Sequence, residues 1–83
     1  MFIAIFETRS PTNTTTNIVK IWINTDDINS AQTIALNRLN QEGIEVTSTV
    51  EIIETDKGDY FPPCSSLDAF MQAELEGIAV LYS

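Results

Sequence analysis

The sequence contains no histidine and a single cysteine, Cys64, among its 83 residues. Histidine is the commonest general base and metal ligand at neutral pH, so its absence removes the usual means of hydrolytic and metal-assisted catalysis. One cysteine cannot form an internal disulfide, and Cys64 has no imidazole to activate it as a nucleophile. We therefore expect a protein that is not an enzyme and that uses no cofactor.

Basic residues are also scarce, since four Lys and Arg face twelve Asp and Glu and leave a net charge of −8. Such a charge repels phosphate backbones and anionic lipid headgroups, so we expect neither nucleic acid nor membrane binding. A basic protein is the partner that this charge favours. The apolar opening MFIAIF is too short for a signal-peptide core or a membrane span, which predicts a cytoplasmic protein.

The chain is short, but 43% of its residues are hydrophobic, which is enough for one core without a metal or disulfide. We expect a single α+β domain over residues 1–83. Strand formers and apolar alternation mark four strands, and apolar residues at helical spacing mark two helices. The predicted strands are residues 1–7, 18–24, 44–55 and 78–83, and the predicted helices are 26–43 and 66–76.

The order of these elements, ββαβαβ, predicts a two-layer sandwich with a mixed four-stranded sheet. We expect both helices on one face of that sheet, and the first two strands to form an antiparallel hairpin. An alternative makes DKGD (56–59) a hairpin turn and Tyr60–Phe61 a short fifth strand. Residues 18–82 would then resemble a ferredoxin-like unit with an extra N-terminal strand, and the sequence leaves both arrangements open.

Each predicted helix carries an apolar stripe and signals at its ends. Asp26 or Asp27 can cap the first helix, and Gly43 lies where a left-handed C-terminal residue belongs. Gly77 ends the second helix in the same way. The apolar face of the first helix consists of Ile28, Ala31, Ile34, Ala35, Leu36 and Leu39, in which Ala31, Ala35 and Leu39 lie four residues apart. The buried stripe expected in the second helix consists of Leu67, Phe70, Met71 and Leu75.

The acidic stretch ETDKGDYFPPC (54–64) is either a metal-binding loop or a turn. If strands 18–24 and 44–55 run parallel, Asp26, Asp27, Asp56 and Asp59 leave them at one rim, where four carboxylates could hold Ca²⁺ or Mg²⁺. However, the first pair also suits a helix start, and the second pair suits a tight turn. We therefore favour a turn, and keep cation or small-ligand binding as an alternative.

Trp22 lies opposite Val19, Ile21 and Ile23 in strand alternation. If both helices cover the face of those three residues, Trp22 lies on an uncovered face, together with Phe2 and Phe6 or else with Ile3 and Ile5. Exposed apolar patches usually mark an interface. Our leading hypothesis is a non-enzymatic homodimer that packs through this face, with Phe2, Phe6, Lys20, Trp22 and Ile53 in the interface.

A second hypothesis rests on the acidic residues. Five carboxylates lie within fifteen residues and only Lys57 opposes them, which predicts an acidic surface for a basic protein partner. An acidic inhibitor or immunity-type protein would work in this way. The residues of this predicted surface are Glu45, Glu51, Glu54, Asp56 and Asp59.

Overall fold

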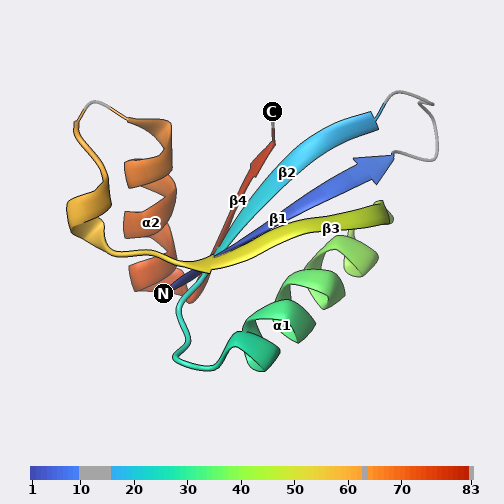
Figure 1. Ribbon diagram of the computed structural model, residues 1–83, viewed down its shortest axis with the longest axis horizontal. Helices are drawn as coiled ribbons and strands as arrows, with labels where there is room; N and C mark the ends of the chain where they lie inside the picture. Colours follow the sequence, from blue (N-terminus) through green and yellow to red (C-terminus); the bar gives the residue numbers. More distant parts are fainter. Residues whose placement is uncertain (10–15, 63, 83) are drawn as a thin grey trace.

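A four-stranded sheet with one helix on each side forms the structure (Figure 1), a computed structural model that describes residues 1–9, 16–62 and 64–82. The strand order is β3-β1-β2-β4, and every neighbouring pair is antiparallel. The predicted element order is confirmed, but the predicted mixed sheet is wrong because β1 lies between β2 and β3. The elements are β1 (Phe2–Arg9), β2 (Thr16–Ile23), α1 (Ile28–Gln41), β3 (Glu45–Glu54), the short 3₁₀ helix η1 (Lys57–Asp59), α2 (Ser65–Glu76) and β4 (Ile78–Tyr82).

The first two strands form the predicted antiparallel hairpin. Phe2 lies opposite Ile23 at one end of the pair, and Arg9 lies opposite Thr16 at the other. The loop predicted between the two strands falls largely on residues 10–15, which are outside the described residues. Both strands carry apolar side chains on both faces, so each face of the sheet centre needs a cover.

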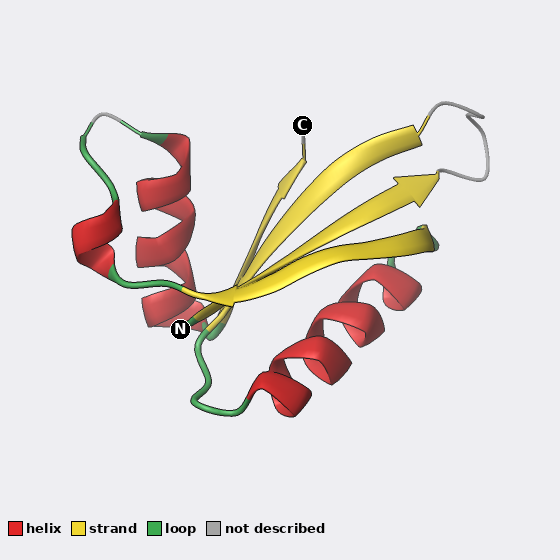
Figure 2. Ribbon diagram, in the orientation of Figure 1, coloured by secondary structure: helices red, strands yellow, loops and turns green. Residues whose placement is uncertain are grey.

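The two helices cover opposite faces of the sheet (Figure 2), so the prediction that both lie on one face is wrong. The connection through α1 returns from β2 to β3 across one face, whereas α2 joins the two edge strands across the other. Two separate cores result. The core under α1 contains Phe2, Ala4, Phe6, Val19, Ile21, Ile23, Ala31, Ala35 and Leu39. The core under α2 contains Ile3, Trp22, Ala69, Phe70, Ala73 and Ala79.

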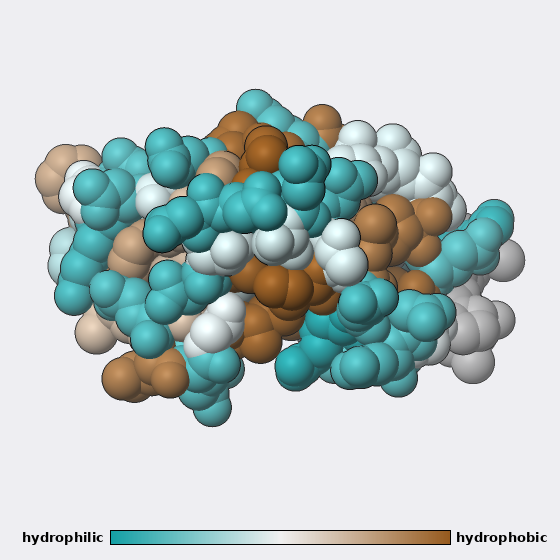
Figure 3. Space-filling view, turned by 90° about the horizontal axis from the view of Figure 1, so that it is seen from below, coloured by the Kyte–Doolittle hydropathy of each residue, from teal (hydrophilic) through white to brown (hydrophobic). Residues whose placement is uncertain are grey.

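The signals in helix α1 act as predicted. Asp27 is the N-cap, and its carboxylate accepts hydrogen bonds from the Asn29 amide at 3.1 Å and the Ser30 hydroxyl at 2.9 Å. Gly43 has a φ of 71°, in the left-handed region that glycine favours. Ala31, Ala35 and Leu39 are fully buried and Leu36 packs partly against the core, but Ile28 and Ile34 of the predicted apolar face are 46% and 40% exposed. Seen from the side of α1, hydrophilic residues surround separate apolar areas of the surface (Figure 3).

Helix α2 buries a different stripe from the predicted one. Leu67 and Phe70 are buried as expected, but Met71 is 44% exposed and Leu75 is 89% exposed. Ala69 and Ala73 take their place against the sheet. Small side chains let the helix approach the sheet closely. Helix α2 therefore turns Ala69 and Ala73 toward the sheet, instead of the larger Met71 and Leu75.

The segment after β3 is a turn. The Asp56 carboxylate accepts a hydrogen bond from the Lys57 amide at 2.7 Å, and the Asp59 carboxylate accepts one from the Asp56 amide at 2.9 Å. The bond to the Asp59 carboxylate, together with one from the Asp59 amide to the Asp56 side chain, forms a capping box around η1. Tyr60 and Phe61 are not in a strand, so the fifth strand that the ferredoxin-like alternative requires does not form there.

Candidate binding site

Trp22 is fully buried beneath α2, so the prediction that it lies on an uncovered face is wrong. Its indole Nε1 donates a hydrogen bond to the hydroxyl of Tyr60 at 3.1 Å. The Tyr60 ring in turn packs against Phe70 with 5.9 Å between ring centroids. The indole has therefore both an apolar cover and a polar partner, which a buried tryptophan needs.

The Tyr60 hydroxyl also forms a hydrogen bond with the segment that leads into the acidic turn. It lies 2.6 Å from Thr55 Oγ1, and that hydroxyl donates to Asp59 Oδ2 at 3.2 Å. A carboxylate only accepts, so Thr55 uses its hydrogen toward Asp59, and Tyr60 must donate to Thr55. Hydrogen bonds thus run in one direction from Trp22 to Asp59. They tie the acidic turn to the core under α2.

The other residues predicted for the dimer interface do not share one surface. Phe2 and Phe6 are buried in the core under α1. Ile3, which lies opposite Trp22 in the neighbouring strand, is on the Trp22 side of the sheet, so the alternative pair Ile3 and Ile5 is the one on this face. Lys20 is half-buried, and 38% of Ile53 is exposed.

Three of the five predicted acidic residues come together around a cleft of about 580 Å³. Glu54 reaches it from the end of β3, and Asp56 and Asp59 from the turn around η1. A fourth carboxylate, Glu74, comes from α2. We call this site the acidic cleft, which is lined by Met1, Asn24, Glu54, Thr55, Asp56, Asp59, Phe70 and Glu74.

The carboxylates of the acidic cleft differ in how they are held. Those of Asp56 and Asp59 accept hydrogen bonds within the turn. Glu74 lies 3.9 Å from the Lys57 ammonium, and both side chains of this ion pair are about half exposed. The carboxylate of Glu54 makes no hydrogen bond or ion pair with any described residue. Glu54 and Glu74 are therefore the two carboxylates best able to accept an incoming cationic group.

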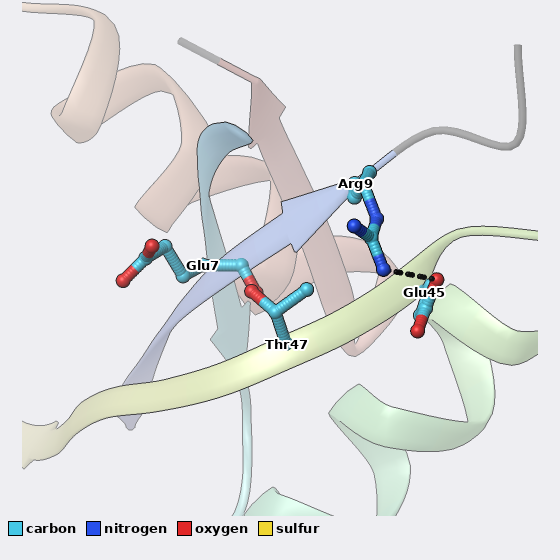
Figure 4. A network of polar contacts seen from close by, with 4 residues as sticks. All are labelled: Glu7, Arg9, Glu45 and Thr47. Atoms are coloured by element: carbon cyan, nitrogen blue, oxygen red, sulfur yellow. Dashed lines mark hydrogen bonds and ion pairs between the residues drawn. The ribbon is translucent and has the colours of Figure 1, made fainter. Parts of the chain in front are cut away.

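Glu45 and Glu51 lie away from the acidic cleft. Glu45 is at the opposite end of β3, about 30 Å from Glu54 along an extended strand. It forms an ion pair with Arg9 at 3.4 Å (Figure 4), close to the contact in which the Thr47 hydroxyl donates to the Glu7 carbonyl at 3.0 Å. The single acidic surface predicted from the sequence is therefore divided between the two ends of the strand.

The four aspartates proposed as a metal site are not brought together. Strands β2 and β3 run in the same direction, as predicted, because both are antiparallel to β1. Yet neither Asp26 nor Asp27 lines the acidic cleft. Hydrogen bonds from Ser30 and from the Asn29 amide lower the pKa of Asp27, as expected for a helix cap. Residues 1–9, 16–62 and 64–82 contain no group of three or more Asp, Glu or Cys placed to hold a metal ion.

Glu74 and Asn24 belong to the cleft but were not predicted from the sequence. Glu74 follows Phe70 by four residues, so both lie on the same side of α2. That spacing could have placed Glu74 beside the buried stripe. Asn24 follows β2 directly, and only its backbone bond to Gly77, at 3.0 Å, fixes it beside the start of β4. This contact arises because β2 and β4 are neighbouring strands, a pairing that the sequence does not reveal.

Comparison of the chain with protein-family models, curated proteins and solved structures finds no match. Neither helix in the described part of the chain has the length and apolar character needed to cross a membrane.

Proposed function

We propose that this protein is a non-enzymatic binding protein whose acidic cleft receives basic side chains of a protein partner. The observation that carries the proposal is the meeting of four carboxylates from β3, the η1 turn and α2 around one cleft. Lysine and arginine are the side chains that such a field attracts most strongly. An inhibitor or immunity-type protein that blocks a basic partner would act through a surface of this kind.

The ion pair at the acidic cleft can exchange its lysine for a basic side chain of a protein partner. Lys57 and Glu74 form a long, half-exposed ion pair, and such pairs stabilise a fold little. An arginine from a partner can therefore take the place of Lys57 at small cost and form a bidentate contact. Phe70 supplies an apolar wall, against which the aliphatic part of the incoming side chain can pack.

The acidic turn is held in place before any partner arrives. The hydrogen bonds from Trp22 through Tyr60 and Thr55 end on Asp59. A site that is already ordered loses less conformational freedom on binding, which favours affinity. The acidic cleft is thus better suited to binding than an acidic loop without such support.

The test uses an unstructured arginine-rich peptide as the probe and two double variants of equal charge. Glu54→Gln with Glu74→Gln alters the acidic cleft, whereas Asp26→Asn with Glu76→Gln removes the same charge from exposed positions outside it. Two exposed carboxylate contacts together contribute about 1.4 kcal/mol, so the cleft variant should bind about tenfold more weakly. The control variant should bind nearly as well as the wild type. Calorimetry gives both dissociation constants.

Amide chemical shifts locate the same interaction. Titration of the labelled protein with the peptide should move the amide signals of Asn24, Thr55 and Phe70 most. Equal weakening by the two double variants would mean that the peptide responds only to net charge. That result, or the largest shifts near Glu45, would contradict the proposal.

A further inference from the structure

Part of the sheet face that carries α2 is not covered by either helix of the described segments. Helix α2 packs on β2 and β4 and covers the end of the face that holds Trp22. Beyond α2 the strands continue toward the other end of the sheet, with α1 on the opposite side (Figure 1). Among the side chains that cross-strand pairing places on this open area, six next to α2 form what we call the open half-face: Ile5, Glu7, Ile18, Lys20, Glu51 and Leu81.

The open half-face is apolar at its centre. Ile5 and Leu81 lie on either side of Lys20 in the neighbouring strands and pack partly against the core under α2. Both remain half-exposed, and Ile18 is 36% exposed. These side chains extend the core under α2 onto the surface. An area of this kind usually marks a contact with another molecule.

Lys20 differs from the other basic residues of the chain. Arg9, Arg38 and Lys57 each form an ion pair with a glutamate. Lys20 forms an ion pair with no carboxylate among the described residues, although it is half-buried between Ile5 and Leu81. A cation that has no carboxylate partner among the described residues can gain one from a second molecule.

We propose that the open half-face binds a second copy of this chain. The area carries one cation, Lys20, and two carboxylates, Glu7 and Glu51, so it is complementary in charge to itself. In a contact with two-fold symmetry, Lys20 of one protomer meets a glutamate of its partner, and the same ion pair forms twice. A basic partner would instead meet Lys20, and a strongly acidic one would be repelled by the net charge of −8.

The net charge also opposes the approach of two copies, and this gives the proposal a distinctive salt dependence. The acidic cleft shares no residue with the open half-face, and its Glu54 lies about 10 Å along β3 from Glu51. Charges at that separation are largely screened at about 0.15 M salt. Dimerisation should therefore strengthen as salt rises from low concentration to that level, whereas binding of a basic peptide to the cleft should weaken.

Sedimentation and light scattering at micromolar concentration test the proposal. The wild type should have twice the monomer mass of 9.2 kDa. Lys20→Glu brings three carboxylates together and should raise the dissociation constant of the dimer about tenfold or more. Arg38→Glu, an equal charge change on α1, should leave the dimer intact. The emission of Trp22, which is buried two residues from Lys20, shows whether each variant is folded, and Lys20→Gln replaces Lys20→Glu if that chain unfolds.

Two variants with opposite charges on the open half-face test the proposal most directly. A chain with Glu7→Lys and Glu51→Lys should also be monomeric, because it then carries three lysines on this area. Mixing it with the Lys20→Glu chain should restore a dimer that contains one copy of each. A wild-type chain that stays at the monomer mass overturns the proposal, and so does a folded Lys20→Glu chain that dimerises as well as the wild type.

Discussion

The indole of Trp22 donates a hydrogen bond to the hydroxyl of Tyr60 at 3.1 Å, although the two residues lie 38 positions apart in the sequence. Tyr60 follows the acidic turn, and Trp22 lies near the end of the inner strand β2. The bond therefore joins the part of the chain that forms the acidic cleft to the core under α2. Loss of this bond, loss of the indole itself and ionisation of Tyr82 at the sheet edge should each lower the stability of the fold.

Tyr60→Phe should destabilise the protein by about 1–3 kcal/mol, because it leaves the buried indole N–H of Trp22 without its acceptor. The variant keeps the ring contact with Phe70, so the loss measures the hydroxyl alone. Urea unfolding gives the free energy. Tyr82→Phe is the matched control, since its hydroxyl contacts Glu42 at an exposed position. Equal unfolding midpoints for wild type and Tyr60→Phe would show that the hydroxyl contributes nothing to stability.

Trp22→Asp should fail to fold, because it places an unpaired carboxylate and a large cavity under α2. The expected loss is about 5 kcal/mol or more, comparable to the whole stability of a domain of this size. Circular dichroism measures the outcome. Lys20→Asp introduces the same group two positions away at a half-exposed site and should remain folded. A folded Trp22→Asp chain would place the indole outside the core.

Stability should fall at alkaline pH through Tyr82. Partial burial raises the pKa of Tyr82 to about 12 from its ordinary value of 10.0, and the hydrogen bond and negative charge of Glu42 add to this effect. The folded state holds this proton more tightly than the unfolded state. The contribution is therefore complete below pH 10 and is lost as pH rises toward 12.

Tyr82→Phe isolates this effect. The unfolding free energy of the wild type should fall relative to that of the variant as pH rises from 10 to 12. The wild type should also show a tyrosinate absorbance change near pH 12 that the variant lacks. A constant difference across this range would mean that the proton on Tyr82 is not linked to folding.

Features that depend on neighbouring residues could be predicted from the sequence. The hairpin of β1 and β2, the capping aspartate of α1 and the glycine after each helix all follow from local patterns. The i, i+4 residues Ala31, Ala35 and Leu39 of the predicted apolar face are buried for the same reason, whereas Ile28 and Ile34 at its margin are exposed. In α2 the predicted stripe is partly wrong. The spacing of the apolar residues does not show whether the alanines or Met71 and Leu75 pack against the sheet.

The placement of the two helices could not be predicted in this way. Apolar residues on both faces of β1 and β2 indicate that both faces are covered. They do not indicate whether a helix or a second chain provides the cover, so Trp22 was assigned to an interface instead of to a core. Strand order decides this, since α2 crosses the second face to join the two edge strands. The same crossing brings Glu74 to the acidic cleft.

The separation of the two cores bears on the order in which the chain folds. All buried residues of the core under α1 lie before residue 40, whereas the core under α2 needs residues 69 to 79. During synthesis, the sheet can therefore acquire its first cover while Trp22 still faces solvent. We expect Trp22 fluorescence in refolding experiments to change later than the far-ultraviolet signal. Until α2 arrives, the nascent chain exposes an aromatic surface that the finished protein hides completely.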